Sequence, residues 1–205
     1  MKRIVLALLF AAGLCPGLYA QRFRAGLRAG GNIMDYSMPA VVFDDGTFRK
    51  GDVKAGFEAA LVVRLGITKH LHLQTEFAYN RANYDFDYLD NRAGRRSVTI
   101  NANRMEVPVE LGLNFGGLRL FGGAVFRIAH SERSSNTALL KVGFNDSDVG
   151  FTAGAGFLYK SFFVEGRVSG YFTPHTRNRF TSLGETQTVN FGRHLRWSLS
   201  TGILF

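Results

Sequence analysis

The chain ends in the stretch RWSLSTGILF, residues 196–205, and this stretch decides how the rest of the sequence is interpreted. Every second residue in it is apolar or tolerates apolar surroundings, which is typical of a β-strand with one apolar face. Most chains fray at their end. A terminal strand that finishes on an aromatic residue therefore needs a partner strand and an apolar environment. The alternating positions are Trp197, Leu199, Thr201, Ile203 and Phe205.

Seven further segments alternate in the same way, at residues 22–31, 54–66, 70–80, 104–114, 118–129, 150–160 and 162–172. Eight segments of about ten residues match the length that a tilted strand needs to cross a bilayer. The connections alternate between short and long, and the long ones cover residues 31–53, 82–99, 131–149 and 174–193. Outer-membrane barrels have short periplasmic turns and longer external loops.

These patterns predict an all-β fold, an eight-stranded antiparallel up-and-down transmembrane β-barrel. The last strand would pair with the first to close the cylinder, because lipid offers no water to an unpaired strand edge. A soluble β-sandwich also alternates, but its strands are shorter, at about 5–6 residues. Its second face would be solvated, whereas the polar face here is rich in Gly, Ala and Ser, which suits a crowded lumen.

The N-terminus has the features of a secretory signal peptide. Lys2 and Arg3 precede an apolar run, Pro16 and Gly17 break it, and small Ala20 offers a cleavage point. The run is too short to span ~30 Å of hydrocarbon as a helix. We expect a signal peptide at residues 1–20 and a barrel domain at residues 21–205, located in the outer membrane of a Gram-negative cell. Cleavage there removes Cys15, the single cysteine.

The charge pattern predicts an ionic lumen. The chain has a net charge of +9, but the four long segments carry 10 Lys and Arg against 11 Asp and Glu, so the positive excess lies in the strands. Inward charges must pair or stay hydrated, and an eight-stranded interior is filled by side chains. We therefore expect a closed core and no nucleic-acid partner. The predicted core residues are Arg24, Arg28, Glu58, Arg64, Glu76, Glu106, Glu110, Arg119, Arg127, Glu165, Arg167 and Arg196.

Candidate sites outside the lumen are few. His130, Ser131 and Glu132 include nucleophile and acid–base types, but three adjacent residues rarely converge on one proton-transfer geometry. The histidines lack metal-site spacing, so we expect no catalytic residue, no metal and no cofactor. The segment NYDFDYLDNRAGRR either binds a partner, a cation or lipopolysaccharide head groups, or is a self-paired strand extension. Its candidate binding residues are Tyr84, Asp85, Phe86, Asp87, Tyr88, Arg92, Arg95 and Arg96.

Two stretches resemble a known family. RMEVPVELGLNFGGLRLFGGAVFR and FTAGAGFLYKSFFVEGRVSGYF are similar to the hairpins of the small PorT-like outer-membrane β-barrels of Bacteroidota, which have an OmpA/OmpX-like eight-stranded architecture. The resemblance implies the barrel and carries no catalytic residues with it. Some members of that family assist a protein-secretion and gliding system. The terminal aromatic strand also resembles the signal that the bacterial barrel-assembly machinery recognises.

The resulting hypothesis is a non-enzymatic outer-membrane barrel with a structural, adhesive or secretion-accessory role. Its expected partners are outer-membrane lipid and lipopolysaccharide, the barrel-assembly machinery during biogenesis, and a secretion-system or surface protein. Two alternatives stay open, a lipid-modifying outer-membrane enzyme and a small passive pore. An enzyme would need a polar trio on the lipid-facing wall, where the outward positions are almost all apolar.

Overall fold

The structure is a computed structural model and describes residues 23–44, 46–90, 94–135, 141–143, 148–172, 177–182, 185–190 and 194–205. The predicted leader, with Cys15 and the cleavage point after Ala20, lies outside these residues, and so does the candidate binding residue Arg92. The described residues include no helix long and apolar enough to span a membrane.

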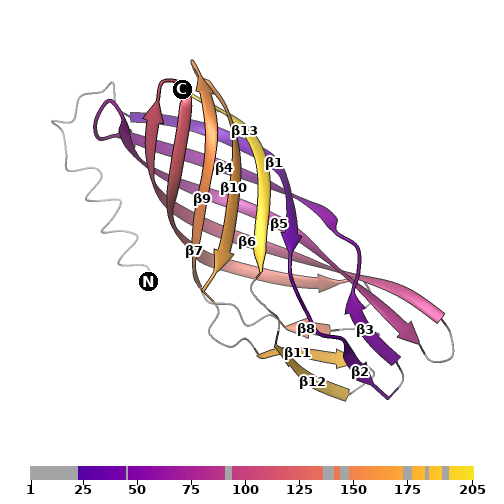
Figure 1. Cartoon of the computed structure of the whole chain (residues 1–205). Helices are drawn as coiled ribbons and strands as arrows, with labels where there is room; N and C mark the ends of the chain where they lie inside the picture. The colour runs from indigo at the N-terminus through magenta and orange to yellow at the C-terminus, as the bar shows by residue number, and fades with distance from the viewer. Residues whose placement is uncertain are drawn as a thin grey trace.

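Eight antiparallel strands close into a barrel, which confirms the predicted fold class (Figure 1). Each strand pairs with its neighbours in sequence, and the last pairs with the first, with Leu27 opposite Ile203. The strands are β1 (Phe23–Asp35), β4 (Lys54–Gly66), β5 (Leu71–Asp90), β6 (Gly94–Phe115), β7 (Leu118–Ser134), β9 (Val149–Tyr159), β10 (Phe162–Tyr171) and β13 (Leu195–Leu204).

Short turns join the strands at one end of the barrel, which we call the turn end. The turn between β6 and β7 is two glycines, and Gly116 has a φ of +64°. A residue without a Cβ adopts this left-handed conformation without strain, which allows a turn this tight. Phe205 lies at the same end, where its backbone N–H donates to the carbonyl of Ala25. The terminal strand is thus tied to the first strand up to its last residue.

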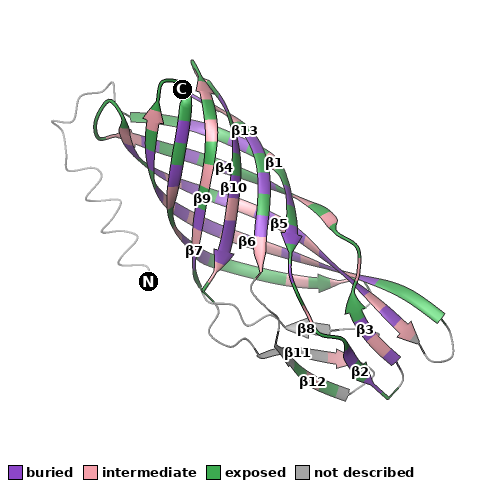
Figure 2. Ribbon diagram, in the orientation of Figure 1, coloured by how far each residue is buried: buried purple, intermediate pink, exposed green. Residues whose placement is uncertain are grey.

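The barrel wall separates side chains by parity, as Figure 2 shows in the alternating colours of each strand. On β13 the outward Leu199 is 67% exposed, whereas the neighbouring Ser200 is 3% exposed. Trp197, Thr201 and Phe205 are likewise exposed, and Ile203 is partly buried. Apolar side chains on the outside suit hydrocarbon, and polar ones fill the interior.

The opposite end of the barrel carries an extension with strands of its own (Figure 1). β5 and β6 continue as one hairpin, and β2 (Val41–Phe43) and β3 (Gly46–Lys50) add to the outer part of β5. A second sheet contains β8 (Lys141–Gly143), β11 (Arg177–Ser182) and β12 (Glu185–Asn190). Gln187 Nε2 donates to the carbonyl of Val42 at 2.6 Å, which links the second sheet to β2.

This extension corrects part of the sequence-based interpretation. The long segments were expected to be loops, but strand pairing continues through residues 84–90 and 94–99. The reason is that the alternation of apolar and polar residues persists there, with Tyr84, Phe86 and Tyr88 on one face. For residues 83–96 a self-paired strand extension was the favoured interpretation, and the structure shows it.

Candidate functional site

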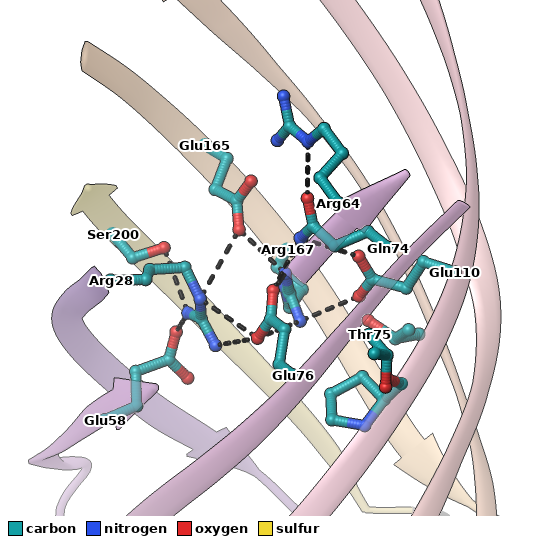
Figure 3. Close-up of polar contacts among 12 residues, drawn as sticks. Arg28, Glu58, Arg64, Gln74, Thr75, Glu76, Glu110, Glu165, Arg167 and Ser200 are labelled. Carbon is teal, nitrogen blue, oxygen red and sulfur yellow. Dashed lines mark hydrogen bonds and ion pairs between the residues drawn. The ribbon is translucent and has the colours of Figure 1, made fainter. Parts of the chain in front are cut away.

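The interior of the barrel contains a network of ion pairs centred on Glu76 (Figure 3). Arg28 donates to Glu76 Oε2 from Nη2 at 2.8 Å, and Arg167 Nη2 donates to Glu76 Oε1 at 2.8 Å. Gln74 Nε2 adds a third donor at 2.7 Å. The guanidinium of Arg28 also pairs with Glu58. Charged hydrogen bonds from several strands thus converge on one carboxylate and cross-link the wall.

A second group of pairs lies next to the first. Arg167 contacts Glu165 at 2.7 Å and Glu110 at 2.8 Å, so it bridges three glutamates in all. Arg119 pairs with Glu165 at 2.6 Å, and its Nε donates to His72 Nε2 at 3.0 Å. All of these side chains are buried. Such pairing offsets part of the large desolvation cost of interior charge.

A third group is built on Glu106, toward the extension. Arg196 binds this carboxylate with both terminal nitrogens, at 2.8 and 2.6 Å, and Tyr171 donates its hydroxyl to it. The guanidiniums of Arg104 and Arg127 lie 5.3 and 5.2 Å from the centre of the Tyr171 ring. A cavity lined by Arg104, Tyr171, Arg196 and neighbouring side chains has room for about one water molecule.

Eleven of the twelve predicted core residues are buried in the barrel: Arg28, Glu58, Arg64, Glu76, Glu106, Glu110, Arg119, Arg127, Glu165, Arg167 and Arg196. The exception is Arg24, which is exposed at the turn end. It corrects the prediction, because parity gives the direction of a side chain but not its depth. Sequence analysis missed Arg104, which is 4% exposed and precedes Glu106 by two residues on the same face.

The turn end of the lumen is filled by apolar side chains. Val62, Phe163 and Leu204 form a buried cluster, with Leu158 packed against it. The guanidinium carbon of Arg64 lies 5.8 Å from the centre of the Phe163 ring. Arg64 Nε donates to Gln74 Oε1 at 2.8 Å. Ion pairs along the axis and an apolar cluster at one end together occupy the described interior.

In contrast to the ion-paired lumen, the extension is built around an apolar cluster of its own. Phe48 and Tyr88 stack with ring centres 4.6 Å apart, and Tyr36 meets Tyr84 edge-on at 5.3 Å. Phe86 is fully buried beside them. The cluster consists of Met34, Tyr36, Val41, Phe43, Phe48, Ala82, Tyr84, Phe86, Tyr88, Val98, Ile100 and Ala102.

The candidate binding residues of the hairpin are therefore divided between two faces. Tyr84, Phe86 and Tyr88 have their side chains in the apolar cluster, so they are not an exposed binding surface. Asp87 pairs with Arg95 at 2.7 Å on the other face, and Arg96 is exposed. These last three are the described candidates that solvent or a partner can reach.

Asp85 lies on the polar face of the hairpin and holds a neighbouring segment in place. Its Oδ1 accepts from Lys54 Nζ at 2.6 Å and from the hydroxyls of Ser97 and Thr99, each at 2.9 Å. Burial alone would raise the pKa of Asp85, but these three hydrogen bonds outweigh it and lower the pKa. Tyr36 donates to the Asp85 carbonyl, and burial with the nearby carboxylate raises the pKa of this phenol.

The trio His130, Ser131 and Glu132 forms no catalytic arrangement in the described residues. The three lie on β7 opposite Arg104, Asn103 and Ala102 of β6, in regular pairing. Successive residues of a strand point to opposite faces, so Ser131 is directed away from its two neighbours. Among the residues that the structure describes, no group of three or more His, Cys, Asp or Glu side chains is placed to hold a metal ion.

Comparison with known proteins gives a family and an architecture. The family described as outer membrane protein beta-barrel domain matches residues 19–173. The crystal structure of Ail, the attachment invasion locus protein of Yersinia pestis, in complex with the heparin analogue sucrose octasulfate, is similar at 12% identity and a TM-score of 0.47. This match covers 90% of this chain and 99% of that one.

Two further solved structures are similar. Neisserial surface protein A matches at 12% identity and a TM-score of 0.43, covering 89% of this chain and 97% of that one. Outer membrane protein W of E. coli matches at 10% identity and a TM-score of 0.37, covering 91% and 100% of the two chains. The search of curated proteins gave no significant match.

Proposed function

Because the chain belongs to the outer membrane protein β-barrel domain family, we propose that this integral outer-membrane protein is a non-enzymatic anchor that presents its extension to a partner outside the cell. The barrel would hold the extension at the membrane, and its ion-paired lumen would pass no solute. The long segments would face outward and the turn end the periplasm, as in other outer-membrane barrels.

The observation that carries this proposal is the separate core of the extension. Eleven buried residues from β1, β2, β3, β5 and β6 pack together there with Tyr36, which follows β1 directly. A connection that only joins two strands needs no apolar core, and ordering it costs conformational entropy. A folded surface held at a fixed orientation is what a binding role requires.

The identity of the partner is the finer part of the proposal. The resemblance to PorT-like barrels of Bacteroidota supports a secretion-accessory or surface-protein partner. The outward residues of β13 from Trp197 onward, together with the terminal Phe205, support recognition by the barrel-assembly machinery during insertion. A leader at residues 1–20 stays a prediction, and the mass of the protein from outer membranes tests whether the chain begins at Gln21.

Charge exchange at two exposed positions near the tip of the hairpin tests the binding role. We expect Arg95→Glu with Arg96→Glu to abolish crosslinking of the protein to its partner in native outer membranes. Arg24→Glu, at the turn end, is the matched control and should leave crosslinking unchanged. Partner capture that is equal in all three proteins would contradict a binding role for the extension.

The two alternatives make different predictions. A passive pore would give stable single-channel steps in planar bilayers, whereas paired interior charges and the Val62, Phe163 and Leu204 cluster favour a silent barrel. A lipid-modifying enzyme would release or transfer acyl chains when incubated with labelled lipid. The regular β-pairing of His130, Ser131 and Glu132 supports the absence of such activity.

A further inference from the structure

The outward face of the wall formed by β5, β6 and β7 changes from apolar to polar residues between one row and the next. On β5 the outward Phe77 is 48% exposed and Tyr79 follows it, but the next outward residues are Arg81 and Asn83. On β6 the change comes after Met105, at the same level, because Tyr79 pairs with Met105 and Arg81 with Asn103. The hydrocarbon band therefore ends at this row.

The first two polar rows above that band are linked by side-chain contacts, and we call them the belt, formed by Arg81, Asn101, Asn103, Ser131 and Arg133. Tyr79 donates its hydroxyl to Asn103 Oδ1 at 2.8 Å. Arg81 Nη2 donates to Asn101 Oδ1 at 3.1 Å, so its guanidinium reaches from β5 to β6. Arg133 of β7 lies directly opposite Asn101. Arg81 and Arg133 thus lie on the two strands that flank Asn101.

Neither guanidinium of the belt pairs with a carboxylate of the described residues. No salt bridge of Arg81 or Arg133 lies within 4.0 Å in the part of the chain that the structure describes, although four interior arginines pair with glutamates. Further out, Lys54 pairs with Asp85 and Arg95 with Asp87. Within the described residues, the positive charge at the level of the lipid head groups is therefore uncompensated.

We propose that the belt binds the phosphate groups of a phosphorylated glycolipid of the outer leaflet. Guanidinium groups bind phosphate through paired N–H donors, and Asn101, Asn103 and Ser131 add groups that hydrogen-bond sugar hydroxyls. Asn83 lies beside Asn101 of the belt, and the polar face of the hairpin continues outward through Thr99. The sugars of a glycolipid would run along this face, whereas the short head group of a phospholipid would not reach it.

This inference rests on the outer-membrane location and the outward orientation of the extension, not on a protein partner. It is tested with bis-phosphorylated lipid A added to the purified full-length protein, with bound lipid counted by native mass spectrometry. We expect the double variant Arg81→Gln with Arg133→Gln to weaken retention about tenfold or more, because two charge-assisted contacts are lost.

The matched control is Arg24→Gln with Lys69→Gln, which removes the same charge from exposed positions at the turn end and should retain lipid A as the parent protein does. Both variants should show the same shift on unheated gels, which reports a folded barrel. Dephosphorylated lipid A should bind the parent protein as weakly as lipid A binds the belt variant, and phosphatidylglycerol should not displace lipid A.

Three results would overturn the inference: equal retention by the belt variant, equal binding of dephosphorylated lipid A, or displacement by phosphatidylglycerol. The last would assign the belt to phospholipid. Failure of partner crosslinking through the extension would leave these lipid measurements unchanged, so the two proposals fail independently.

Discussion

In the barrel part of β5, the inward side chains His72, Gln74 and Glu76 are polar and buried, while the outward Leu73 and Phe77 are exposed. In the outer part of the same strand, Tyr84, Phe86 and Tyr88 occupy the inward face and are buried in an apolar cluster. Asp85 and Asp87 occupy the outward face there. β5 stays paired with β6 in the same register, but the polar and apolar side chains change faces.

The partner strand changes at the same level. On β6 the inward Glu110 and Glu106 give way to Ile100 and Val98 in the extension. The comparison teaches that the medium outside the wall decides which face is apolar. Hydrocarbon draws apolar side chains outward and leaves the charges to pair inside, whereas water above the membrane restores the arrangement of a soluble protein. The following substitutions test the two regions against each other.

The largest expected effect is at the centre of the ionic lumen. Glu76→Gln removes the charge that Arg28 and Arg167 share, and we expect it to lower the free energy of unfolding by about 3–5 kcal/mol, because buried arginines lose a carboxylate. Asp148→Asn is the control, since this pair with Arg127 has a carboxylate that is 70% exposed, and it should cost under about 1 kcal/mol. Urea unfolding in liposomes measures both.

The extension should respond to the loss of apolar volume instead. Phe86→Ala leaves a cavity among Tyr36, Tyr84 and Tyr88, and we expect it to cost about 3 kcal/mol of local stability. Hydrogen exchange should quicken in β2, β3 and the outer part of β5, while the backbone of β13 keeps its protection. Uniform loss of protection through the barrel would show that the two regions do not fold separately.

One face of β6 allows the same substitution to be made in both environments. Leu111, which is 55% exposed on the lipid-facing wall, should lose about 2–4 kcal/mol when changed to Arg. Asn101→Arg, on the same face but above the hydrocarbon, should cost no more than about 1 kcal/mol, because water screens its repulsion from Arg81 and Arg133. Similar costs at both positions would place the boundary elsewhere.

The smallest effect concerns pH. Because the pKa of Asp85 is lower in the folded extension than in the unfolded chain, the carboxylate stabilises the fold above the usual aspartate range. That contribution is lost as the pH falls from about 4 downward. The hydrogen-exchange protection factor of Gly51, whose N–H donates to the Asp85 carbonyl, should fall in acid. In Asp85→Asn this acid dependence should disappear.

Sequence patterns predicted the barrel well because both faces of each strand meet a uniform medium over about ten residues. Strict alternation therefore predicted which residues of β13 face outward, such as Trp197, and which face inward, such as Arg196. It also gave the candidates for the ionic core. How deep an inward side chain lies in the lumen was not predictable in the same way. Arg24 has the correct parity but lies at the rim, and Arg104 was missed at the end of a segment.

The extension was harder to predict because its alternation is reversed. The segment at residues 82–90 contains the signal, with Tyr84, Phe86 and Tyr88 two residues apart, but these aromatics continue the parity of Glu76 rather than that of Phe77. If apolar residues are expected on the same face throughout, their change from the outward to the inward face looks like the end of the strand. The short strands β8, β11 and β12 pair through long-range contacts that no local pattern specifies.

The exchange of faces along β5 can be measured directly by spin labels placed one at a time at Leu73, Phe77, Arg81, Asp85 and Asp87 in bilayer-embedded protein. Collision rates with oxygen, which concentrates in hydrocarbon, and with a water-soluble nickel chelate report the medium at each label. We predict oxygen access at Leu73 and Phe77 and nickel access from Arg81 onward, with the change between Phe77 and Arg81. Oxygen access that continues to Asp85, or nickel access at Phe77, would contradict this account.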